Sequence, residues 1–214
     1  MELTFEIIVE NLKQGKNFTW SRWGDGEFRC LLQTKPGGMN CDAHEYFPDM
    51  GERLKEILLS KPPYYLGIQG LAIEQNKDDE TFQHLQRINE WSSNELLTRA
   101  SIKGYLNEFI EALEDKNIVF VGNEFLRKCP VKYSTYIEVP ITNCWLEHDR
   151  VLGELDVVKQ GDVVIFACSM MANVLIDEMY KIHGETITLI DVGSVLEVTV
   201  GRAIRTYQKK MLEQ

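Results

Sequence analysis

The sequence predicts an α/β protein, a doubly wound and mostly parallel sheet with helices on both faces. Two observations predict this class. Short apolar runs recur in the second half of the chain, at residues 118–122, 136–140, 163–167 and 186–191. Runs that are apolar on both faces are typical of strands covered on both sides. Helical segments such as residues 172–182 separate them, as crossovers between parallel strands require.

The N-terminal part is predicted to begin with a helix and a strand. Apolar residues recur at helical spacing over residues 3–14, and Gly15 follows as a terminator. Residues 18–23 are typical of a strand, and residues 27–33 are expected to begin a helix that leads away from it. Turn-forming residues fill positions 34–48, which we expect to be a loop beside the site.

The middle of the chain is predicted to be mainly helical. A helix over residues 50–59 ends before two prolines, and a short strand is expected over residues 64–69. Residues 74–114 carry apolar and aromatic side chains at near-helical spacing and are interpreted as one helical section of two helices. No repeat or linker is visible, so residues 1–214 are predicted to form a single domain, with the 44% hydrophobic and 26% charged content of a soluble protein.

Composition narrows the partners and the compartment. A net charge of −10 argues against a protein that grips a nucleic-acid backbone. The densest basic clusters, Arg202 with Arg205 and Lys209 with Lys210, fall on an expected terminal helix. No apolar run could span a bilayer and no basic leader is visible, so we expect neither a membrane span nor a signal peptide. The five scattered cysteines favour reduced thiols in a cytoplasm.

Asp25 and Glu27 are the first candidate site residues. They flank Gly26 just after the strand expected at residues 18–23. In an extended backbone, side chains two residues apart point to the same face. Two hard oxygen ligands can hold Mg²⁺ or Mn²⁺, which is then shared with substrate phosphates. The ordinary alternative is a solvated acidic turn, because Asp-Gly is a common turn dipeptide.

Other candidates follow other strands, because ligands of doubly wound sheets bind beyond the carboxyl ends of the strands. The segments expected at that edge are residues 22–27, 122–124, 168–171 and 191–194. The third opens a helix whose free N–H groups could bind a phosphate, although Ser169 could equally be a helix cap. Asp191, with Gly193 near it, could orient a sugar hydroxyl, support a metal or cap the next helix. No GxGxxG, GxxxxGK[ST] or GxSxG motif is present.

A family resemblance rests on four segments. Residues 22–28, RWGDGEF, resemble the R-[FW]-G-D-G-E signature of the GT-D-type glycosyltransferases. Residues 139–145 resemble the proline-to-asparagine segment of that family, and residues 167–175 resemble its strand-to-helix turn. Residues 190–193 resemble its D-x-G near the C-terminus. The first motif is fairly specific, and the other three support it.

The resemblance implies a Rossmann-like, GT-D-like fold and a metal-dependent glycosyltransferase. The donor would be a nucleotide sugar, with a UDP-sugar expected, and a hexosyl or pentosyl group would move to an acceptor hydroxyl. Asp25 and Glu27 would hold Mn²⁺ or Mg²⁺ on the donor diphosphate, and Arg22 would pair with the diphosphate or fix the carboxylates. Further donor-binding positions are Gly24, Gly26, Asn143, Ser169, Met170, Asp191 and Gly193.

The sequence leaves the acceptor and part of the mechanism open. A glycan or glycoprotein acceptor is expected ahead of a modified nucleic acid, because the chain is acidic, and a homo-oligomer is possible. Ser194 stands where the family pattern D-x-G-H has a histidine, and Cys168 and Ser169 stand where it tends to have glycine. Two alternatives remain: a metal-dependent phosphoester or nucleotide hydrolase that uses the same carboxylates, and a non-catalytic protein that binds nucleotide sugars.

Overall fold

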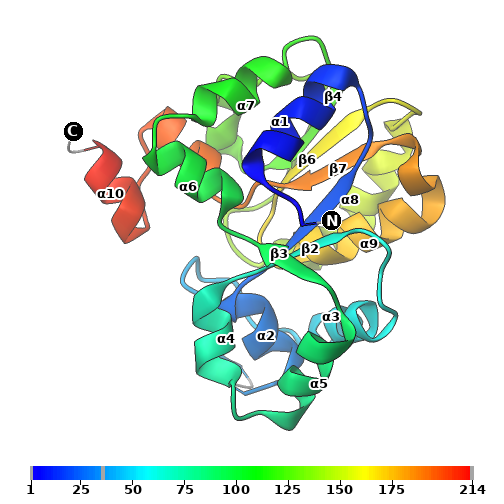
Figure 1. The fold of residues 1–214 in the computed structure, drawn as a ribbon, viewed down its shortest axis with the longest axis vertical. Coiled ribbons are helices and arrows are strands. Elements are labelled where there is room, and N and C mark those ends of the chain that lie inside the picture. The colour runs from blue at the N-terminus through cyan, green and yellow to red at the C-terminus, as the bar shows by residue number, and fades with distance from the viewer. Residues whose placement is uncertain (1, 35–36, 213–214) are drawn as a thin grey trace.

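The computed structural model describes residues 2–34 and 37–212, which are arranged around a central sheet (Figure 1). In these ranges the sheet has seven parallel strands in the order β3-β2-β1-β7-β6-β4-β5. They are β1 (Thr19–Trp23), β2 (Tyr65–Ile68), β3 (Trp91–Ser93), β4 (Ile118–Gly122), β5 (Thr135–Glu138), β6 (Val163–Ala167) and β7 (Thr188–Asp191). The predicted α/β class is confirmed.

Neighbouring residues of a strand point to opposite faces of the sheet. Both faces are apolar here, and helices cover both. Phe120 and Ile165 pack against α1 (Phe5–Gln14), α6 (Leu96–Ile102) and α7 (Leu106–Ala112). The adjacent Val121 and Phe166 point the other way, toward α8 (His148–Glu154) and α9 (Met171–His183). A third apolar cluster joins Trp23 and β2 to α2 (Asp25–Leu31), α3 (Pro48–Leu59), α4 (Gly70–Asn76) and α5 (Glu80–Ile88).

Residues 74–114 are not one helical section, so that prediction is wrong. Strand β3 interrupts the helices α4, α5, α6 and α7. Asn89 leaves the helical conformation, with φ −113° and ψ 154°, and its side-chain amide donates to Leu85 O at 2.9 Å. Ser92 Oγ donates to Leu66 O at 3.0 Å, which helps to hold β3 against β2. A strand of three residues is too short to show a period of its own.

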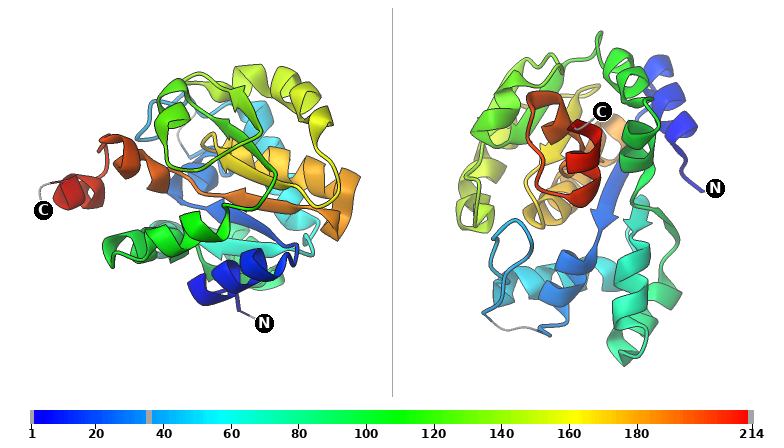
Figure 2. Two further views of the ribbon diagram at one scale, coloured as in Figure 1. Left: turned by 90° about the horizontal axis from the view of Figure 1, so that it is seen from above. Right: turned by 90° about the vertical axis from the view of Figure 1, so that its left-hand side faces the viewer.

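The C-terminal helix is shorter than predicted. Arg202 and Arg205 precede α10 (Thr206–Leu212) instead of lying on it. We call residues 201–208 the C-terminal strap. The side-chain oxygen Oε1 of its buried Gln208 accepts hydrogen bonds from the peptide N–H groups of Ile204, at 2.9 Å, and of Arg205, at 2.8 Å. Figure 2 shows the chain leaving the end of β7 and running outward to α10. None of the helices in the described ranges is long and apolar enough to cross a bilayer.

Candidate active site

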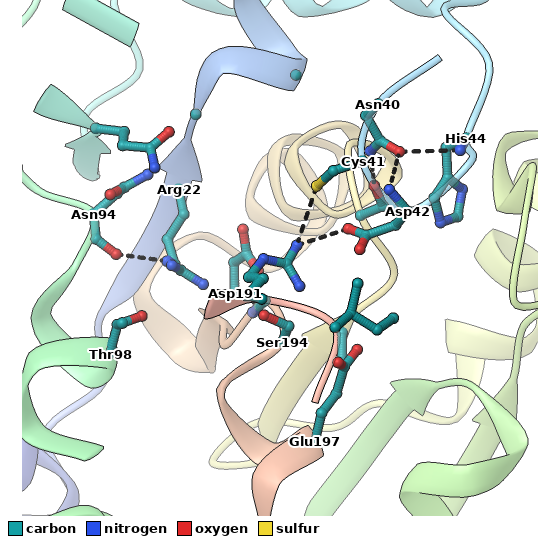
Figure 3. A pocket seen from close by; sticks show the side chains of 18 of the residues that line it. Arg22, Asn40, Cys41, Asp42, His44, Asn94, Thr98, Asp191, Ser194 and Glu197 are labelled. Atoms are coloured by element: carbon teal, nitrogen blue, oxygen red, sulfur yellow. Dashed lines mark hydrogen bonds and ion pairs between the residues drawn. The ribbon is translucent and has the colours of Figure 1, made fainter. Parts of the chain in front are cut away.

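A cavity of about 290 Å³ lies at the carboxyl edge of the sheet (Figure 3). Six strands deliver a residue to its wall at or just after their last position, and these residues are Gly24, Gln69, Asn94, Asn123, Ala167 and Asp191. The strands β1, β2 and β3 follow one another toward one edge of the sheet. The chain then crosses to β4, which lies on the other side of β7. Such a switch point opens a crevice between strand ends, where ligands of doubly wound sheets bind.

Asp25 and Glu27 lie on a helix, so the predicted extended backbone at residues 25–27 is wrong. Helix α2 begins at Asp25, with Gly24 as its N-cap. Glu27 turns back and its Oε2 accepts the Gly24 N–H at 2.7 Å, a capping arrangement that favours a helix start. Side chains two positions apart on a helix diverge. Both residues nevertheless line the cavity.

The two carboxylates have different surroundings. Asp25 is about one-third exposed, and its Oδ2 lies 3.4 Å from Arg29 Nη2. Burial raises the pKa of the Glu27 carboxyl to about 7, although the backbone N–H groups of Glu27 and Gly24 act in the opposite direction. Asp191 and Asp25 raise the Glu27 pKa as well, because their negative charges lie close by. Glu27 can therefore exchange a proton near neutral pH.

Arg22 and Asp191 join β1 to β7 at the cavity. Arg22 Nε donates to Asn94 O at 2.7 Å, as Figure 3 shows. Asp191 Oδ1 accepts the Gly193 N–H at 2.8 Å, and burial raises the Asp191 pKa while the Arg22 charge lowers it. The left-handed φ of Gly193, 52°, suits glycine. Arg22 is therefore held against the D-x-G turn. Its two predicted roles, pairing with a diphosphate and fixing the carboxylates of Asp25 and Glu27, remain predictions.

The turn between β6 and α9 brings Ser169 to the cavity. Ser169 has a left-handed φ of 54°, unusual for a residue with a side chain, and its Oγ accepts Asn40 Nδ2 at 3.0 Å. Met170 is the N-cap of α9, but it is buried and outside the cavity wall. Its Sδ would lie 3.8 Å from a Cβ built on Gly26, so it packs behind the first turn of α2.

Asn143 lies outside the cavity wall. Its Oδ1 accepts the Glu45 N–H at 2.8 Å, and its Nδ2 donates to Glu45 Oε1 at 3.0 Å. Asn143 thus holds the loop at residues 37–46, which we call the 37–46 loop. The wall contains Asn40, Cys41, Asp42 and His44 of this loop, so the expected position of the loop beside the site is confirmed. Donor contact by Asn143 remains a prediction.

Sequence reasoning missed two groups of wall residues. One comprises Gln69, Asn94, Glu95 and Thr98, which follow β2 and β3. The predicted strand over residues 64–69 marks Gln69, whereas the others follow a strand that was not predicted. The second group lies on or beside the C-terminal strap and comprises Glu197, Arg202, Ile204, Arg205 and Tyr207. The sequence marks Arg202 and Arg205 only as a basic cluster, because their place at the cavity depends on contacts made by Gln208.

The wall suits a cation that is shared with a ligand better than a complete metal cage. Among the described residues, no three His, Cys, Asp or Glu are grouped so as to hold a metal ion. The wall does contain six carboxylates against the guanidinium groups of Arg22, Arg202 and Arg205. Mg²⁺ sites often use one or two carboxylates together with substrate phosphates. Asp25, with the nearby Glu27, fits that requirement.

Comparison with known proteins identifies the fold. No family model matches the sequence, and no curated protein matches it. A solved structure of domain of unknown function 1792, described as having a distinct glycosyltransferase fold, is 16% identical, with a TM-score of 0.63 over 91% of this chain and 78% of that chain. A structure from Streptococcus sanguinis, described as a new glycosyltransferase of this domain type, is 14% identical, with a TM-score of 0.65 over 91% and 81%.

A likeness at this level of identity shows the fold. The chain has an α/β glycosyltransferase fold, as residues 22–28 led us to expect. Its structural neighbours are structures of domain of unknown function 1792.

Proposed function

We propose that the protein is a glycosyltransferase that moves a sugar from a nucleotide-sugar donor to an acceptor hydroxyl. The observation that carries this proposal is the position of Asp25, Glu27 and Asp191 around one cavity at the switch point of a glycosyltransferase fold. A cavity of about 290 Å³ is at the small end for ligand sites, which suits enclosure of the reacting part of a donor.

A divalent cation, Mn²⁺ or Mg²⁺, is part of the proposal. When bound, it would neutralise charge on the departing nucleoside diphosphate. Asp25, with its partly exposed carboxylate, and Glu27 would hold it. The excess of carboxylates in the wall supports this assignment, because a diphosphate would otherwise meet net negative charge.

The remaining residues would bind and orient the donor. The N–H groups at the start of α9, next to Ser169, would receive a phosphate, because a helix N-terminus favours an anion. Asp191 would accept a hydroxyl of the ribose or the sugar, and Arg22 would keep Asp191 in place. Gly24 and Gly26 would keep the backbone beside the cavity free of side chains. Met170 and Asn143 would act indirectly, by supporting α2 and the 37–46 loop.

The proposed donor is a UDP-sugar and the proposed acceptor a glycan or glycoprotein. The net charge of −10 and the carboxylate-rich wall make a modified nucleic acid a less favoured acceptor.

The test is to incubate the protein with Mn²⁺ and a panel of UDP-, dTDP- and GDP-sugars, and to measure release of nucleoside diphosphate. We expect slow release from one donor and its loss on removal of the metal. The double variant Asp25→Asn, Glu27→Gln should lose at least about 100-fold in rate and keep its fold, because it removes charge stabilisation and leaves the shape unchanged. Arg127→Gln is the matched control, since it breaks an exposed ion pair outside the cavity.

Other outcomes would favour the alternatives. Near-normal release by the double variant, with metal still required, would remove Asp25 and Glu27 from the site. Inorganic phosphate released from nucleotides would indicate a hydrolase. Tight donor binding without turnover would indicate a non-catalytic binding protein.

A further inference from the structure

Three buried polar atoms in one part of the cavity wall have no hydrogen-bond partner among residues 2–34 and 37–212. They are Asp42 Oδ1 in the 37–46 loop, and Arg202 Nε and Arg205 Nη1 in the C-terminal strap. Buried polar groups are nearly always hydrogen-bonded, so three such atoms on neighbouring segments need an explanation. One is an acceptor and two are donors.

The protein holds these side chains firmly in place. Arg205 Nη2 pairs with Asp42 Oδ2 at 2.7 Å, which connects the strap to the loop. Arg202 Cζ lies 4.1 Å from the centre of the Phe125 ring. Gln208 fixes the backbone of the strap and donates to Ser194 O at 2.9 Å. The orphan atoms are therefore not the ends of mobile surface side chains.

The charge of this wall indicates which ligand it suits. Two guanidinium groups face two carboxylates, Asp42 and Glu197, so the formal charges in this part of the wall cancel. This part therefore has no excess positive charge to attract a diphosphate. A hydroxyl group both donates and accepts, and vicinal hydroxyls can therefore satisfy carboxylate and guanidinium atoms together. Phe125, Ile204 and Tyr207 add apolar surface in the same wall, which suits the C–H face of a sugar ring.

We propose that Asp42, Arg202 and Arg205 form a subsite for a pyranose ring, separate from the part of the cavity that takes the diphosphate. This inference rests on the proposed function, because the sugar would belong either to the donor or to the acceptor. In Figure 3, Asp42 and Glu197 lie on one side of the cavity, away from Arg22 and Asn94. The 37–46 loop also connects the subsite to the Ser169 turn, through the bond between Asn40 and Ser169.

The experiment compares ligands with and without a sugar. Binding of UDP, UDP-glucose, UDP-galactose and UDP-N-acetylglucosamine is measured by calorimetry with Mn²⁺, in the wild type, Arg205→Gln and Asp42→Asn. Methyl glycosides of the same sugars are titrated in the presence of saturating UDP. Arg127→Gln is again the control, because the Arg127–Glu138 pair has similar geometry, with 2.9 Å between Nε and Oε2, outside the cavity. Thermal unfolding checks the fold, and the near-isosteric Asp42→Asn provides a second test should Arg205→Gln misfold.

We expect both variants to bind UDP within about twofold of the wild type and to bind one sugar-bearing ligand at least about tenfold more weakly, as for the loss of a charged hydrogen bond. Weaker binding of a nucleotide sugar would assign the subsite to the donor, and weaker binding of a glycoside would assign it to the acceptor. An equally large loss of affinity for UDP itself would overturn the proposal in favour of phosphate binding. Unchanged affinity for every ligand would also overturn it, because Asp42 and Arg205 would then form only a structural ion pair.

The wild type separates this inference from the function on which it rests. If it binds glycosides through Arg205 but no nucleotide sugar, the subsite holds and the proposed donor is wrong. If it binds neither class, the subsite and the proposed UDP-sugar donor are both overturned, and release of nucleoside diphosphate from the dTDP- and GDP-sugars then decides the proposed function.

Discussion

Arg22 Nη1 occupies the space that a side chain on Gly193 would need. A Cβ built on Gly193 would collide with this nitrogen. Gly193 also donates its N–H to Asp191 Oδ1, and Arg22 Nε donates to Asn94 O. The turn after β7 and the arginine at the end of β1 are therefore fitted to each other, and that fit connects three strand ends at the cavity.

Replacing Gly193 by alanine should displace Arg22. The left-handed φ of 52° costs an alanine about 1–2 kcal/mol, and the collision with the guanidinium adds to this. We expect a lower free energy of unfolding. We also expect release of nucleoside diphosphate to be at least about tenfold slower, because a small displacement of groups that position a substrate lowers the rate strongly. Urea unfolding and release of nucleoside diphosphate measure the two effects.

Gly15→Ala is the control for that substitution. Gly15 has a φ of 66°, and a Cβ built there meets no atom within 4 Å. It should show the cost in stability of the left-handed conformation alone, with donor turnover unchanged. Equal losses of turnover in the two variants would contradict a specific role for the contact between Arg22 and Gly193.

The central strands could be predicted because their side chains are apolar on both faces, as burial between two layers of helices requires. β4 and β6 are buried throughout, and the predicted bounds 118–122 and 163–167 agree with the structure. β3 could not be found in the same way. Pairing with β2 holds its three residues in the sheet, and such tertiary context outweighs the local preference of so short a segment.

The candidate site was predictable in its position and less so in its local shape. Parallel topology brings the strand ends together, so Asp25, Ser169 and Asp191 line one cavity as expected. Gly-Asp-Gly-Glu fits a turn after a strand and also a helix start. The hydrogen bond from Gly24 N–H to Glu27 Oε2 stabilises the helix start, and the sequence pattern alone does not indicate that contact.

Glu27 should make stability depend on pH. Its pKa is about 7 in the folded protein against an ordinary value of 4.5, so the folded state retains a proton that the unfolded chain loses. Without metal, the free energy of unfolding should therefore fall as the pH rises between these values, by about 1–3 kcal/mol. Glu27→Gln, whose amide oxygen can still accept the Gly24 N–H, should remove that part of the slope. Identical slopes in urea unfolding of the two proteins would refute the raised pKa.

His148 should also contribute stability in its protonated form, which for a histidine is the charged form. Its Nε2 lies 2.8 Å from Glu178 Oε2 and its Nδ1 lies 2.9 Å from Asp149 Oδ1, and the hydrogen bond to Glu178 is the main cause of its raised pKa. The stabilisation should be complete below the unfolded pKa of about 6.5 and be lost as the pH rises through the folded pKa. His148→Gln should therefore destabilise the protein more at about pH 5.5 than at about pH 8.5, by roughly 1 kcal/mol.

His84→Gln provides the comparison, because it makes the same exchange at an exposed histidine. A His148→Gln penalty that is the same at both pH values would indicate that the histidine acts only by packing against Trp145, whose ring centre lies 4.8 Å from its own.

The backbone and the side chain of Ser169 should make separable contributions. Its φ of 54° suits glycine, so Ser169→Gly should be more stable than Ser169→Ala by about 1 kcal/mol. Both variants lose the hydroxyl that accepts Asn40 Nδ2, while Asn40 Oδ1 receives the N–H groups of Asp42 and His44 and so orders the 37–46 loop. Both should therefore bind a nucleotide sugar more weakly than the wild type. Thermal unfolding and calorimetry test the two contributions, and equal melting temperatures for the glycine and alanine variants would show that the left-handed turn costs the protein nothing.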